Sequence, residues 1–313
     1  MPKEKLTVYG GQAVMEGVMM RGQRAMAVAV RAPDGSIKLH TEPLDSVYNQ
    51  PLFKLPFIRG LLGLWDALGL GMRSLLWSAN VAVGEEAVFS GPLGIGTVLF
   101  SLTLAISLFF LTPALIGSGF DAWLGLDPLT TNLIEGLARL VIVIAYISLI
   151  ALMSDVKRLY GYHGAEHKTI NAFEAGAELT PANVAKFSLY HPRCGTAFIL
   201  IVVLFSIVLF TLLGDLPFWL KLVSRVLAIP VLAALAYEYL RFTARNITNP
   251  VIRALALPGL WMQRLTTREP DLTMLEVAIV AFQEMQRTES ATAELNLPDR
   301  VLPAAEAQPE ATP

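Results

Sequence analysis

Four long apolar segments set the first limit on how this chain can fold. Each is close to the roughly 20 residues that an α-helix needs to cross a bilayer. Only 16% of the 313 residues are charged, whereas a soluble domain has about 25%. The sequence therefore predicts a mainly α, polytopic α-helical protein of a cell membrane with about four transmembrane helices. The segments are residues 95–117, 133–153, 196–213 and 217–240.

Positive side chains are distributed unevenly among the connecting segments. The 118–132 connection has no Lys or Arg, whereas the 154–195 segment contains five such residues. Cytoplasmic loops of membrane proteins carry the excess of Lys and Arg. Both termini and the 154–195 segment are therefore predicted to be cytoplasmic. The apolar segments indicate the lipid bilayer as a partner. The net charge of −2, without a basic run that includes aromatics, gives no sign of a nucleic-acid partner.

The segment 57–80 is long enough to span a bilayer but has a second interpretation. Its polar residues recur every seven positions, so on a helix they drift by only about 20° per repeat and form one narrow stripe. This stripe and a row of small residues favour a helix lying in the membrane interface. The sequence leaves open which of the two holds. The stripe consists of Arg59, Asp66, Arg73 and Asn80.

Charged residues also occur in or near the predicted spans. Glu135 and Arg139 are four apart, the spacing at which opposite charges pair on a helix, so they are predicted to pair with each other. Arg225 lies within the fourth span. Glu238 lies at its cytoplasmic end, where it faces either a functional site or solvent.

The segments outside the spans divide the chain further. Residues 24–31 and 36–41 flank a type I turn sequence and predict a β-hairpin within a β-rich unit at 1–55. The other units are an interfacial helix at 56–90, a membrane domain at 91–245 with an insert at 154–195, and a C-terminal helix region at 246–288. In this last region, 257–270 reads as a turn-rich connection and 272–287 as an amphipathic helix whose capping box is Thr273 and Glu276. The tail 289–313 is rich in Ala, Glu and Pro and is predicted to be disordered.

A glycine-rich segment at 10–22 precedes the predicted hairpin. One interpretation is a loop that packs onto the hairpin, because glycine-rich segments are common between elements. The other is a loop that brings Gln12, Glu16 and Arg21 to a functional site. Considered alone, the segment favours the first.

The polar stretch 160–196 contains the residues best suited to chemistry. His163 and His167 are four apart, so both rings lie on one face of a helix, at the spacing at which two imidazoles can hold one zinc-sized ion. Glu166 completes an H-x-x-E-H pattern, in which the carboxylate can act as a base on a metal-bound water. Glu174 lies on the same face, but a rise of about 1.5 Å per residue places it roughly 10 Å beyond His167.

A return of the chain would supply further ligands. The first helix is predicted to stop at Gly176, and Thr180-Pro181 suits the start of a second helix over 181–190. Two helices joined by a short loop run antiparallel, so this cytoplasmic helical hairpin would bring His191 and Cys194 beside His163 and His167. That set predicts one divalent transition metal, with zinc the best match. The alternatives are a polar cluster at the membrane interface and, for Arg193, a membrane anchor rather than a substrate contact.

Several of these motifs together resemble the YqhQ-like family of bacterial membrane proteins. They are residues 8–22, 163–168, 191–196, 266–271 and 275–279. The resemblance covers nearly the whole chain except the tail. The family is labelled as predicted metal-dependent enzymes, while its domain is classed as having unknown function. The resemblance implies that the 10–22 segment and a second segment, with Thr266, Thr267 and Glu269, help to build the site.

Two functions remain open at this point. One is a metal-dependent hydrolase at the cytoplasmic face of the membrane, with Glu166 as base and a lipid-linked or membrane-peptide substrate. The other is a non-catalytic scaffold or membrane-protein assembly factor that has a structural metal and binds other membrane proteins. The chain lacks the large soluble domains of the better-known inverzincin peptidases, and no downstream glutamate is an obvious third ligand. Peptidase activity is therefore only one option among hydrolases.

Overall fold

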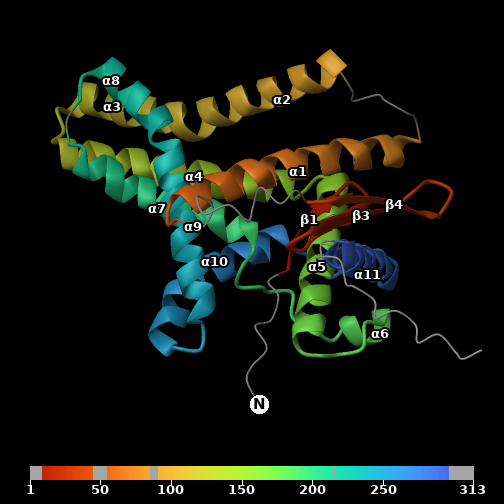
Figure 1. The fold of residues 1–313 in the computed structure, drawn as a ribbon. Coiled ribbons are helices and arrows are strands. Elements are labelled where there is room, and N and C mark those ends of the chain that lie inside the picture. Colours follow the sequence, from red (N-terminus) through yellow and green to blue (C-terminus); the bar gives the residue numbers. More distant parts are fainter. Residues whose placement is uncertain (1–8, 45–54, 85–90, 215, 296–313) are drawn as a thin grey trace, which may run out of the picture.

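The computed structural model describes residues 9–44, 55–84, 91–214 and 216–295. It consists of apolar helices joined to a small sheet that is covered by helices on both faces (Figure 1). Three described helical segments are long and apolar enough to cross a membrane: Gly94–Leu124, Pro128–Ile150 and Gly195–Leu212. A pair bent by 42°, Phe218–Leu227 with Ile229–Arg245, makes a fourth if it counts as one broken span. The predicted multi-pass, mainly α architecture is therefore confirmed.

The first of these segments is not one uniform α-helix. It comprises α2 (Gly91–Ile106), a π-helix η3 (Ser107–Leu111) and α3 (Thr112–Leu124). The other spanning elements are α4 (Pro128–Ile150), α7 (Gly195–Leu212), α8 (Phe218–Leu227) and α9 (Ile229–Arg245).

The N-terminal sheet has four antiparallel strands in the order β1-β2-β3-β4. The predicted hairpin is β3 (Ala25–Arg31) with β4 (Ile37–Pro43), and it is confirmed. The glycine-rich segment is not a loop, since it forms a second hairpin from β1 (Gly10–Val14) and β2 (Gly17–Arg21). The sequence did not predict these strands by alternation of polar and apolar residues, because β2 is buried on both faces and does not alternate.

Three helices cover the two faces of the sheet. Val18 and Met20 pack in one core with α5 (Ser154–Glu174) and α11 (Leu272–Leu295). Met19 and Val28 pack in a second core with Leu70 of α1 (Ile58–Val83). The sheet therefore lies between α1 and α11 (Figure 1).

This arrangement bears on the open question of segment 57–80. Helix α1 is not among the described helices that are long and apolar enough to span. Its C-terminal half covers the sheet, and its N-terminal half approaches α9, where Gly60 lies against Tyr237. Arg59 of the polar stripe pairs with Glu238, so that carboxylate is neither at the predicted site nor simply solvated.

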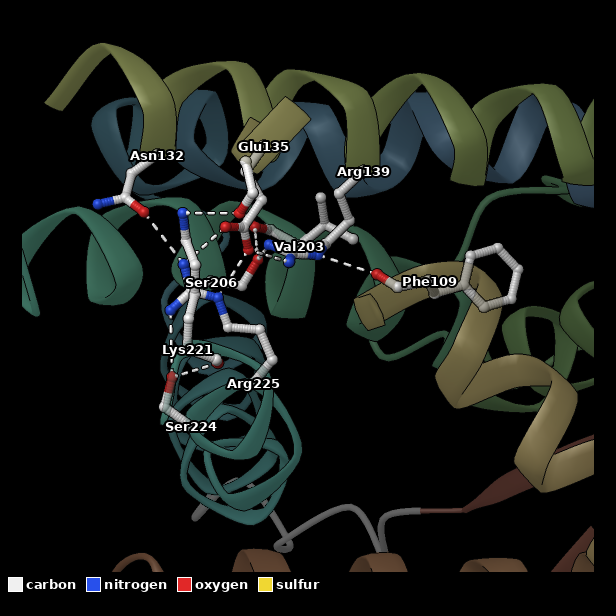
Figure 2. A network of polar contacts seen from close by, with 10 residues as sticks. Phe109, Asn132, Glu135, Arg139, Val203, Ser206, Lys221, Ser224 and Arg225 are labelled. Carbon is white, nitrogen blue, oxygen red and sulfur yellow. Dashed lines mark hydrogen bonds and ion pairs between the residues drawn. The ribbon is translucent and has the colours of Figure 1, made fainter. Parts of the chain in front are cut away.

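The buried charges of the membrane domain form one network (Figure 2). Glu135 accepts a hydrogen bond from Arg139 Nη2 at 2.7 Å, as the spacing predicts. It also accepts hydrogen bonds from Arg225 Nε and Nη2 at 2.8 and 2.6 Å. All three side chains are at most 2% exposed. The pair expected from the sequence is thus a triad that links α4 to α8.

The structure differs from the prediction at three places in the insert and the C-terminal region, namely residues 181–190, residues 257–270 and helix α11. The second helix of the hairpin, α6, covers only Pro181–Val184 rather than 181–190. Beyond it, Asn171 Nδ2 donates to the carbonyls of Ser188 and Tyr190 and holds them in a non-helical turn. The predicted turn at 257–270 is largely helix α10 (Pro250–Thr266), with Pro258 inside it.

The third difference concerns α11. Its predicted face of Leu275, Ala278, Ile279 and Phe282 is buried, as expected. However, Asp271 accepts the Met274 N–H, so it takes the capping role predicted for Thr273. The helix also continues to Leu295, into the predicted tail, and Glu289 accepts the backbone N–H groups of Gln23 and Arg24. The rest of the predicted tail lies outside the described residues.

Candidate metal centre

Helix α5 and the start of α7 carry the candidate ligands. Helix α5 ends at Glu174, and Gly176 follows with a φ of 71°, as the prediction of a stop at this glycine requires. The chain then returns through α6 to Cys194, which is the N-cap of α7. His163 and His167 therefore face Cys194 from the neighbouring element.

The ligand atoms of three predicted ligands lie close together. One donor atom each of His163, His167 and Cys194 lies within 4.8 Å of the other two. His163 Nε2 is 3.2 Å from Cys194 Sγ, and the ring centroids of His163 and His167 are 4.4 Å apart. Two imidazoles and a thiol at this separation form a donor set suited to zinc or a similar transition metal.

The hydrogen bonds of the two imidazoles determine which ring nitrogen of each is available to bind a metal. His163 Nδ1 lies 2.8 Å from the Thr266 carbonyl and His167 Nδ1 lies 2.5 Å from the Leu189 carbonyl. Because a carbonyl only accepts, each Nδ1 must donate, and each Nε2 of the neutral ring carries the lone pair. His167 Nε2 is buried without a hydrogen-bond partner among the described residues. Backbone carbonyls orient metal-binding histidines in this way.

Cys194 lies at the start of α7, with its Sγ 3.2 Å from His163 Nε2. Its Sγ accepts the Thr196 N–H at 3.4 Å at the start of an 18-residue helix. A metal ion binds the deprotonated form of a cysteine, so metal binding here would release the Cys194 proton.

His191, the fourth predicted ligand, lies beside this group but outside it. Its ring is 5.7 Å from the His167 ring, and its Nε2 is 3.8 Å from a Glu174 oxygen, too far for a hydrogen bond. Burial lowers the pKa of His191. Its backbone N–H and carbonyl both bond to the side-chain amide of Gln263. No local pattern in the sequence points to Gln263, because this contact joins residues 72 positions apart.

Glu174 and Arg193 form an ion pair next to His191. Arg193 thus has a protein partner in addition to any role at the membrane surface. Burial alone would raise the pKa of the Glu174 carboxyl, but Arg193 and His191 keep it below its ordinary value.

Glu166 is buried next to the first strand. Burial raises its pKa to about 7, while the charge of His163 and the N–H of Gly11 act in the opposite direction. A Cβ on Gly11 would lie 2.8 Å from Glu166 Cγ and 2.7 Å from the Met19 carbonyl, so only glycine fits between them. Gly11 is therefore the residue of the 10–22 segment that contacts the predicted base. In the sequence, the signals for it are the glycine-rich composition of the segment and the family resemblance.

Gln12 and Glu16, two other candidates of this segment, contact other parts of the fold. Gln12 lies against Gly71 of α1. Glu16 pairs with Arg158 of α5, and Tyr162 donates a hydrogen bond to it. Arg21 ends β2, paired in register with Met26.

The segment 266–270 lies directly against α5. The Thr266 carbonyl bonds to His163, Thr267 Oγ1 donates to the Gln263 carbonyl, and Glu269 pairs with the buried Lys168 at 2.7 Å. Gly164 permits this approach, because a Cβ there would lie 2.2 Å from the Arg268 carbonyl oxygen. Thr266 thus orients a candidate ligand, while Thr267 and Glu269 hold the segment in place.

Comparisons with known proteins place these residues in a wider group. A family model described as "Protein of unknown function (DUF1385)" matches residues 55–288. The chain is also 33% identical to the uncharacterized protein YqhQ of Bacillus subtilis (strain 168), over 93% of this chain and 96% of that protein. None of the solved structures matches it.

Proposed function

This chain belongs to the DUF1385 family, as its resemblance to YqhQ-like proteins implied, and we propose that it is a metal-dependent hydrolase at the cytoplasmic face of the membrane. The ligands are His163, His167 and Cys194, and zinc suits them best. One observation carries the proposal. Both imidazoles direct Nδ1 to a backbone carbonyl and so leave Nε2 beside a buried thiol.

The residues divide the chemistry among them. A zinc ion held here would act as a Lewis acid and favour deprotonation of water at neutral pH. With only these three protein ligands, a bound zinc would have a fourth position open for water, as catalytic zinc sites require. Glu166 accepts the proton of the attacking water, and Gly11 holds its carboxylate in place. The Thr266 and Leu189 carbonyls keep the imidazoles oriented.

A second function is favoured by His191. Its buried Nε2 has no hydrogen-bond partner among the described residues. If this nitrogen moves to the metal, four protein ligands close the site, which is the pattern of structural zinc. The protein would then be a scaffold or assembly factor in which the metal links α5 to α7.

Metal content of the purified protein tests the shared premise. Wild type should carry about one transition metal per chain, and His163→Ala/His167→Ala should carry none. His40→Ala is the matched control, because His40 lies on β4, paired with Glu42, and should not change metal content. A metal-free wild type after growth with added zinc and iron would exclude both functions.

Two further variants separate the hydrolase from the scaffold. In the hydrolase, Glu166→Gln keeps the metal and abolishes the cellular function of the protein in a complementation assay. His191→Ala then also keeps the metal. In the scaffold, His191→Ala loses the metal, while Glu166→Gln behaves like wild type. Glu178→Gln, an exposed site just beyond the same helix, controls for loss of a carboxylate.

A further inference from the structure

A cavity of about 210 Å³ lies within the membrane domain, between α4, α7 and the π-helix η3. Its walls are apolar, and the only charged side chain among its lining residues is Arg139. The lining residues used below are Phe109, Arg139, Val143, Tyr146, Ile199 and Val202.

The cavity is placed to open sideways between the spans. Tyr146 of α4 and Ile199 of α7 are 43% and 44% exposed, so its rim reaches the outer surface of these two helices. Both helices are long and apolar enough to span, so at this depth the surroundings are lipid chains.

One end of the cavity lies close to the metal centre. Ile199 follows Cys194 by five residues on α7, which is roughly 7 to 8 Å along the helix axis. Arg139 hydrogen bonds to Ser206, and Val143 packs with Val203, so α4 and α7 run antiparallel. Arg139 therefore lies at the far end, roughly 10 Å further along α7 from Ile199.

The buried charge network builds that far end (Figure 2). Arg139 Nε donates to the Phe109 carbonyl in the π-helix at 2.9 Å, and its other nitrogens bond to Ser206 and Glu135. Its guanidinium also lies over the Phe110 and Phe210 rings. Because these groups engage all three nitrogens, Arg139 closes the cavity without requiring an anionic ligand.

We propose that this cavity holds one hydrocarbon chain of a membrane lipid whose polar part lies at the metal centre. The substrate class is then a lipid or lipid-linked molecule rather than a membrane peptide. An apolar chain fits the apolar lining surface of this cavity, and it enters from the bilayer without crossing water. This inference rests on the proposed hydrolase for its chemistry, but the binding of the chain can be tested separately.

The test uses a phosphatidylglycerol with a diazirine in one acyl chain. Protein reconstituted in vesicles of this lipid and phosphatidylethanolamine is extracted, washed with detergent and irradiated, and labelled peptides are identified by mass spectrometry. Wild type should be labelled within 143–147 and 198–203. Val143→Phe and Val202→Phe fill the cavity and should abolish this labelling. Val141→Phe, on the exposed side of α4, should retain it.

Thermal unfolding and metal content of each variant accompany the labelling. Labelling that persists in folded Val143→Phe and Val202→Phe, or that is absent in wild type, overturns the proposal. If wild type binds metal but gives no labelling, the lipid inference alone fails. If the lipid is held in a metal-free wild type, the hydrolase fails and the chain-binding cavity stands.

Discussion

Removal of the Glu135 carboxylate should destabilise the membrane domain more than removal of any exposed carboxylate. Glu135 is the acidic member of the buried triad with Arg139 and Arg225, and it accepts three hydrogen bonds of 2.6 to 2.8 Å. Glu135→Gln leaves two buried guanidinium groups without their counter-ion. Breaking a buried ion pair by removing one partner costs about 3–5 kcal/mol.

This cost converts to a measurable shift. In soluble domains of comparable size, 1 kcal/mol corresponds to about 2–4 °C in Tm, so the expected decrease is roughly 6–20 °C. The assay is thermal unfolding of the detergent-purified protein, followed by tryptophan fluorescence, with Glu178→Gln as the exposed control.

A double-mutant cycle tests the cause. Arg225→Met also removes one charge, and the combination with Glu135→Gln should be less destabilised than the sum of the two single variants, since the charges compensate each other. A Tm of Glu135→Gln equal to that of the control, or strict additivity in the cycle, would refute the reasoning.

Three further predictions concern helices α5, α10 and α11, which are not among the described candidate spans, and they can be measured by the same unfolding assay. Gly164→Ala should lower the free energy of unfolding by about 1–3 kcal/mol, because the new Cβ meets the Arg268 carbonyl. Gly161→Ala on the same helix meets only the flexible Met274 side chain and should cost less. Equal losses of stability in the two variants would contradict this reasoning. Asn249→Ala removes the side-chain cap of α10 and should cost about 1 kcal/mol, while Asn249→Asp should retain most of it. The pKa of Asp271 lies below its ordinary value. Burial alone would raise this pKa, but the hydrogen bonds from Thr273 and Met274 outweigh that effect. Its cap therefore stabilises α11 at neutral pH and is lost as pH falls through that lowered pKa, and Asp271→Asn should remove this acid dependence.

The elements that depend on local sequence were predictable. Apolar length identified the spanning segments, because a membrane helix satisfies its backbone within its own residues. The four-residue spacing of His163 and His167 was enough to place both rings on one face of α5, and the same logic paired Glu135 with Arg139. The stop before Gly176 and the buried face of α11 likewise follow from residues a few positions apart.

The assembly of the candidate site depended on contacts between distant residues. Cys194 reaches His163 although α6 is only four residues long, because Asn171 and Gln263 hold the returning chain by its backbone. The approach of Gly11 to Glu166 and the addition of Arg225 to the Glu135–Arg139 pair have the same origin. Helical and strand periodicities describe neighbours along the chain. They carry no information about which elements pack together, and that packing decided which polar groups share a buried site.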